Sequence, residues 1–194
     1  MTERAPMPHP IISIFGGSRC QPGDWEYQEA ERLGRQLAEA GYTVCTGGYA
    51  GVMEAANRGA WLAGGDSWGI TVDVFSEPPN PYLSREIRTR DLLERLKVVS
   101  ELAQGFVALR GGIGTLAEVA LFWNLALLGQ ATPNRPVILL GECWDPILAS
   151  LLEHLAFRPK DLSAVVRVRS AEEAVREISR RVPRGDSQRG ESKR

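Results

Sequence analysis

The chain alternates between short apolar runs and longer segments in which apolar residues recur at helical spacing. The first run, residues 11–15, ends in a Gly-Gly pair, which is typical of a buried strand that feeds a turn. The next segment, residues 24–40, carries one apolar face and stops at Gly41, a residue that commonly ends helices. The same alternation predicts strands over residues 11–15, 42–46, 68–75, 86–89, 106–109, 136–140 and 164–168, and helices over residues 24–40, 50–63, 91–102, 115–128, 145–157 and 171–181.

Regular alternation of strand and helix predicts an α/β fold, a Rossmann-like, doubly wound parallel sheet with helices on both faces. The length of 194 residues suits a single domain, which we place at residues 11–182. Residues 1–10, with three prolines, are expected to be a flexible N-terminal arm. Residues 183–194 are polar and are expected to be a disordered tail.

Composition narrows the classes of function. Hydrophobic residues make up 43% of the chain, charged residues 24%, and the formal net charge is -1. These values are typical of a soluble globular protein and argue against nucleic acid and membranes as partners. Three cysteines without a CxxC spacing indicate free thiols, with neither disulfides nor a metal cluster. The N-terminus lacks a secretory signal, so we expect a cytoplasmic protein without a cofactor.

Three glycine-rich turns each follow a predicted strand. The carboxyl ends of parallel strands share one edge of the sheet, so these turns are expected at the same edge. Glycine lets the backbone approach a phosphate, and the helix that follows directs free N–H groups at the anion. The alternative is that these are only tight turns. The GxGxxG and GxxxxGK[ST] patterns are absent, which favours a mononucleotide or sugar phosphate. The candidate phosphate-binding residues are Gly17, Ser18, Gly47, Gly48, Gly111, Gly112, Gly114 and Thr115.

Two charged residues near these turns are candidates for catalysis. Glu118 lies three residues after Thr115, so it is expected on the first helical turn beside the anion site. Thr115 to Glu118 also fits a capping box, in which both side chains would only satisfy the helix start. Arg95 lies on the preceding predicted helix, where the plain alternative is a solvated face.

The segment Arg110-Gly-Gly-Ile-Gly-Thr-Leu-Ala-Glu118, together with Arg95, resembles the LOG family of nucleoside 5′-monophosphate phosphoribohydrolases, whose pattern is an arginine followed by PGGxGTxxE. The resemblance covers nearly the whole chain. It implies that Arg95 and Glu118 form the catalytic pair and that the glycine turn holds the 5′-phosphate. The implied reaction hydrolyses the N-glycosidic bond of AMP or an N6-substituted AMP, a cytokinin precursor, to free base and ribose 5-phosphate. The resemblance also implies a homodimer.

This chain departs from the family pattern at several positions. Arg110 replaces the motif proline, Leu96 replaces a lysine, and Leu92-Leu93 replaces a Met-His pair. Arg110 either adds a phosphate contact or narrows the pocket. The departures motivate an alternative function, a carrier that binds a nucleotide or the molybdenum cofactor without cleaving it. A third alternative is a purely structural partner protein. Decarboxylase chemistry, by which such proteins are often labelled, is rejected because it needs a Schiff-base lysine and only Lys97 lies near the turns.

Overall fold

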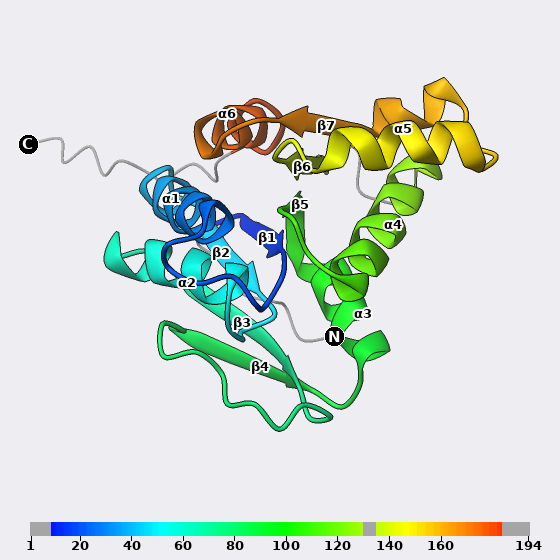
Figure 1. The fold of residues 1–194 in the computed structure, drawn as a ribbon. Coiled ribbons are helices and arrows are strands. Elements are labelled where there is room, and N and C mark those ends of the chain that lie inside the picture. The colour runs from blue at the N-terminus through cyan, green and yellow to red at the C-terminus, as the bar shows by residue number, and fades with distance from the viewer. Residues whose placement is uncertain (1–8, 130–134, 184–194) are drawn as a thin grey trace, which may run out of the picture.

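The chain folds around one parallel sheet of seven strands in the part that the computed structural model describes, residues 9–129 and 135–183 (Figure 1). The arm expected over residues 1–10 and the tail expected over 183–194 lie outside the described residues, apart from positions 9, 10 and 183. The strands are β1 (Ile11–Phe15), β2 (Thr43–Thr46), β3 (Ser67–Val72), β4 (Arg85–Thr89), β5 (Ala103–Ala108), β6 (Val137–Leu140) and β7 (Val165–Val168). The helices are α1 (Trp25–Glu39), α2 (Val52–Leu62), α3 (Leu92–Leu102), α4 (Ile113–Leu127), α5 (Trp144–His154) and α6 (Ala171–Arg181), with a 3-10 helix at Pro159–Ala164.

The strand order is β4-β3-β2-β1-β5-β6-β7, and every adjacent pair is parallel. The predicted Rossmann-like fold is therefore confirmed. The chain builds outward from β1 in one direction, then returns to add β5 on the other side. In such sheets the crevice beyond the carboxyl ends of the two strands at the reversal is the usual place for a ligand. Phe15 pairs with Ala108 at this point, so the turns after β1 and β5 emerge side by side.

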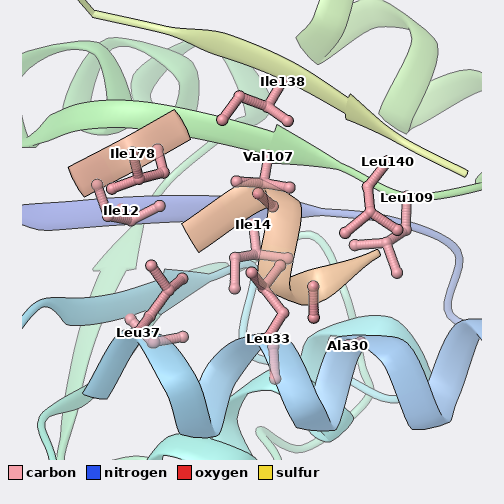
Figure 2. Packing of buried hydrophobic residues seen from close by; sticks show 14 of the residues in the cluster. Ile12, Ile14, Ala30, Leu33, Leu37, Val107, Leu109, Ile138, Leu140 and Ile178 are labelled. Atoms are coloured by element: carbon pink, nitrogen blue, oxygen red, sulfur yellow. The ribbon is translucent and has the colours of Figure 1, made fainter. Parts of the chain in front are cut away.

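Two apolar cores follow directly from the alternation of side chains along each strand. Ile12 and Ile14 of β1 face α1, α2 and α6, and Figure 2 shows them packed against Leu33 and Ile178. Ile11 and Phe15 face the other way, into a core formed with α3, α4 and α5. Strands such as β1 and β6 are covered on both faces and are almost entirely apolar, so they were recognisable as continuous runs, whereas the edge strand β4 is largely polar and exposed.

Two boundaries differ from the predictions in ways that affect the site. The strand expected over residues 68–75 ends at Val72. The Asp73 N–H still donates to Thr89 O of β4, but the Phe75 N–H turns back to Val72 O and so closes a turn. The helix expected over residues 115–128 begins two residues earlier, at Ile113. None of the helices within the described ranges is long and apolar enough to span a membrane.

Candidate active site

A cavity of about 990 Å³ lies at the carboxyl ends of the central strands. The turns after β1, β2, β3 and β5 all contribute to its walls. This is the crevice expected from the strand order, and the volume lies near the upper end of the range for small-molecule sites, roughly 300 to 1,000 Å³. The predicted site residues that line the cavity are Gly17, Ser18, Gly47, Arg95, Gly111, Gly112, Gly114, Thr115 and Glu118.

Arg95 of α3 and Glu118 of α4 form an ion pair in this cavity. Arg95 Nη2 donates to Glu118 Oε1 at 2.9 Å, and the two side chains are only 13% and 12% exposed. Asp91 caps α3 by accepting the Glu94 N–H, which fixes the start of the helix that carries Arg95. A Cβ at Gly47 would lie 2.8 Å from Met53 Sδ and 3.4 Å from Arg95 Nη1, so the turn after β2 packs closely beside the guanidinium. Arg95 is therefore a buried partner of Glu118 and does not lie on a solvated helix face.

Burial raises the pKa of Glu118 to about 7, although the neighbouring Arg95 guanidinium and its hydrogen bond act to lower that pKa. Desolvation penalises the charged carboxylate, and the arginine compensates only in part. A carboxyl group that titrates near neutrality can both give and take a proton at physiological pH. This is a common property of carboxylates at catalytic sites.

The capping-box alternative for Thr115 and Glu118 is wrong. The residue that precedes helix α4 is Gly112, with no side-chain cap, so Thr115 is the third helical residue and Glu118 the sixth. The Glu118 carboxylate accepts from Arg95, and no side-chain cap hydrogen bond is formed at the start of α4. By contrast, Ser170 does cap α6 by accepting the Glu173 N–H.

The first turn of α4 has the features of an anion site. Its opening N–H groups have no intrahelical acceptor, and it holds no acidic residue. Gly111 must be glycine, because a Cβ there would overlap Thr115 Oγ1. At Gly112 and Gly114, however, a Cβ would meet open space, and neither residue has a positive φ. Protein packing and backbone geometry therefore do not require glycine at these two positions. A ligand that approaches the backbone closely would require it.

The turns after β1 and β2 have a different role from that of the α4 turn. Gly17 lines the cavity, but its N–H already donates to Arg110 O at 3.0 Å. Gly48 is buried beneath the cavity lining, and its N–H donates to Thr46 Oγ1 at 2.9 Å. Both N–H groups are engaged within the protein, whereas the opening N–H groups of α4 have no intrahelical acceptor.

A buried polar network holds the turn after β2 in place. Asn57 Oδ1 accepts from Thr46 Oγ1 at 2.6 Å and from Asn80 Nδ2 at 3.1 Å, while Asn57 Nδ2 donates to Ser67 Oγ at 2.8 Å. Asn80 also donates to Tyr49 O. The network therefore ties α2, the turn at Gly47 to Tyr49, and the loop between β3 and β4 into one unit.

An apolar wall of the cavity was missed by the sequence analysis. Val74 and Phe75 leave the sheet after β3 and line the cavity while 64% and 45% exposed. The Tyr49 ring meets Phe75 edge-on at 5.4 Å between ring centroids. The signal that could have revealed this wall is Asp73, a poor strand residue, directly before Val74 in a run interpreted as strand.

These features define a Rossmann-like α/β protein with a ligand cavity at its topological switch point and a buried arginine–glutamate pair inside that cavity. The chain belongs to the protein family described as "Possible lysine decarboxylase", whose model matches residues 53–178. The resemblance to the LOG family is thereby confirmed. The decarboxylase description does not fit the cavity, because the described residues that line it include no lysine and pyridoxal phosphate requires a Schiff-base lysine.

Relatives in this family carry names of nucleotide hydrolases. The chain is 33% identical over 142 residues to the pyrimidine/purine nucleotide 5′-monophosphate nucleosidase of Escherichia coli K12, covering 68% of this chain but 31% of that relative. It thus spans about a third of that relative's length. It is also 29% identical over 177 residues to the cytokinin riboside 5′-monophosphate phosphoribohydrolase of Rhodococcoides fascians, covering 86% of this chain and 88% of the relative.

Solved structures extend the comparison to proteins of another kind. The molybdenum cofactor binding protein of Rippkaea orientalis superimposes with a TM-score of 0.70 at 28% identity, covering 89% of this chain and 96% of that one. The fold is therefore shared between proteins named as nucleotide hydrolases and a protein named for cofactor binding.

Proposed function

We propose that this protein hydrolyses the N-glycosidic bond of AMP or an N6-substituted AMP, releasing free base and ribose 5-phosphate. The observation that carries the proposal is the buried Arg95–Glu118 pair, which lies in one cavity with the open first turn of α4. Relatives named as nucleotide nucleosidases and phosphoribohydrolases support it.

The 5′-phosphate binds at the first turn of α4, where Gly112 and Gly114 leave space for close approach to the backbone. The purine lies against the apolar wall of Val74 and Phe75. In this orientation the ribose lies between the two ends, in reach of Glu118.

Cleavage of the N-glycosidic bond builds positive charge on the ribose ring. The Glu118 carboxylate stabilises that charge and takes a proton from the attacking water, as carboxylates do in glycosidases. The bond between C1′ and the base nitrogen breaks, its electron pair leaves with the base, and water oxygen bonds to C1′. The proton that Glu118 takes from the water then passes to the base nitrogen, which yields the neutral free base. Arg95 favours the ionised form of Glu118, because the guanidinium acts to lower the pKa that burial raises.

The experiment is to incubate purified protein with AMP and with N6-isopentenyl-AMP and to measure free base and ribose 5-phosphate by chromatography. Wild type should release base, and Glu118→Gln should release none while keeping its fold. Glu153→Gln on α5, a change at a side chain 73% exposed and outside the cavity, is the matched control and should retain activity. Base release by Glu118→Gln at the wild-type rate would refute the proposed mechanism.

A homodimer in the cytoplasm is the assembly that we propose for this enzyme. Leu93 and Ile113 are 78% and 82% exposed at the N-terminal ends of α3 and α4, beside the cavity. Large apolar side chains exposed to this extent favour a protein contact. Phe122 and Trp123 of α4 instead pack in the core. Sedimentation should find dimers of wild type and monomers of Leu93→Glu; monomeric wild type would rule the dimer out.

The second candidate function is a carrier for a nucleotide or the molybdenum cofactor. The match to the molybdenum cofactor binding protein covers nearly all of both chains and favours it. The same incubation distinguishes the two functions: AMP that binds tightly and is recovered intact after hours would support the carrier. A small phosphorylated molecule is the ligand in both cases, and nucleic acid is the ligand in neither.

A further inference from the structure

Arg110 occupies the mouth of the cavity at a position where its side chain is not required by the fold. Its backbone oxygen accepts the Gly17 N–H at 3.0 Å and so joins the turns after β1 and β5. That contact uses only the main chain, and any residue, proline included, supplies the same oxygen. The guanidinium is 72% exposed and lines the cavity. The backbone therefore explains the turn, while the side chain is left for another role.

Arg110 forms an ion pair with Glu26 that is weak and easily exchanged. Arg110 Nη1 lies 3.4 Å from Glu26 Oε1, at the long end for a hydrogen bond. Exposed pairs of this kind contribute little to stability, so breaking this one costs little. Glu26 lies in the first turn of α1, where the positive end of the helix dipole stabilises a carboxylate. Glu26 therefore keeps a favourable environment when Arg110 turns to a ligand.

Arg19 brings a second guanidinium to the same mouth. It is exposed, lines the cavity, and follows Gly17 by two residues in the turn after β1. A Cβ on Gly17 would lie 3.5 Å from the Gly111 Cα, so the turns that carry Arg19 and Arg110 are in contact. The acidic residue Asp24 also lines this part of the cavity, but its carboxylate accepts the Gln21 N–H at 2.8 Å.

We propose that Arg110 and Arg19 form a second anion subsite next to the first turn of α4, which holds the β-phosphate of a nucleoside 5′-diphosphate. The inference rests on the proposed function for one point, that the first phosphate binds at this turn. Arginine suits the role because its planar fork matches phosphate oxygens and is always charged. Arg110 releases Glu26 as the ligand enters, so Glu26 is a positioning residue and the arginines are the contacts.

The test measures binding in protein that cannot turn over its ligand. In the Glu118→Gln background, calorimetry with AMP and with ADP should give about ten-fold tighter binding of ADP, the gain expected from one added charge-assisted contact. Titrating AMP in the presence of inorganic phosphate shows whether the second subsite requires a phosphate linked to the nucleotide or also accepts a free phosphate. Glu26→Gln, which removes the competing carboxylate, should increase the preference for ADP. Arg180→Ala, an exposed arginine paired with Glu177 on α6, is the matched control and should keep the preference.

The double variant Arg19→Ala, Arg110→Ala should bind ADP and AMP with nearly equal affinity. The single variant Arg110→Pro should lose most of the preference for ADP. Equal affinity for AMP and ADP in the background protein would overturn the inference, as would a preference for ADP that survives in the double variant. Failure of the proposed function looks different. If wild type releases no base from AMP while ADP preference is present and depends on Arg110, the subsite stands and the hydrolase does not.

Discussion

Replacing Glu118 by glutamine should remove a loss of stability that the wild-type protein suffers on going to alkaline pH, while abolishing its activity. The pKa of Glu118 rises from an ordinary 4.5 to about 7 in the folded protein because the carboxyl group is buried. The folded state therefore holds the proton more tightly than the unfolded state does. By linkage, this group costs no stability below pH 4.5, costs progressively more as the pH rises through about 7, and costs its full amount above that pH.

The magnitude follows from the same two values. A rise in pKa from 4.5 to about 7 corresponds to about 3 kcal/mol of stability lost on going to alkaline pH. Glutamine keeps the shape and an acceptor for Arg95 but never ionises. The free energy of unfolding of the variant, measured relative to that of wild type, should therefore increase by about 3 kcal/mol from acid to alkaline pH. For a chain of this size, this corresponds to roughly 6 to 12 °C in melting temperature.

Denaturation in urea at about pH 5 and about pH 8, with wild type and Glu118→Gln measured side by side, tests this expectation. The informative quantity is how the stability difference between the two proteins changes with pH, since other titrating groups contribute equally to both. Glu153→Gln, at an exposed position, should show no such change. A difference between wild type and Glu118→Gln that is the same at both pH values would refute the claim that burial of this carboxylate costs stability.

Three further changes test other parts of the site. Arg95→Met should raise the pKa of Glu118 further, because Arg95 acts to lower that pKa. The acid limb of the pH–rate profile for base release should therefore move to higher pH. An acid limb that does not move would mean that Arg95 does not act through Glu118. Gly114→Ala should leave stability unchanged or raise it by up to about 1 kcal/mol, yet it should weaken AMP binding. Gly111→Ala should instead lower the melting temperature, because the new Cβ would overlap the Thr115 side chain. Equal stability of the two variants would contradict the packing argument. Asn57→Ala should cost about 3 kcal/mol in urea denaturation by leaving buried groups unpaired, and a loss below about 1 kcal/mol would show that the network is not important.

The fold could be predicted from the sequence because its signals are local. Buried parallel strands are apolar on both faces, so β1 and β6 stand out as continuous runs, and glycines such as Gly41 mark the ends of helices. Boundaries were less accurate where neighbouring strands decide them. β3 ends at Val72 because the Phe75 N–H turns back to Val72 O, and no property of Val74 or Phe75 alone indicates this.

The site was foreseen in its residue types but not in its contacts. The motif spacing placed Glu118 near the glycine turn, yet it fitted a helix cap equally well until the helix was found to start at Ile113. Gly48 carries the same sequence signal as Gly112, but its N–H is taken up by Thr46 inside the protein, whereas Gly112 faces open space. Which backbone donors remain free depends on hydrogen bonds to neighbouring groups, and the sequence does not record them.

The sequence by itself determined the order of elements, the strand edge at which the chemistry gathers, and the candidate pair Arg95 and Glu118. Only the tertiary structure brought that pair to 2.9 Å and buried it, because the two residues lie on different helices whose approach depends on how α3 and α4 pack on the sheet. The raised pKa of Glu118 has the same origin. Desolvation depends on everything that surrounds a group, and that environment is assembled from distant parts of the chain.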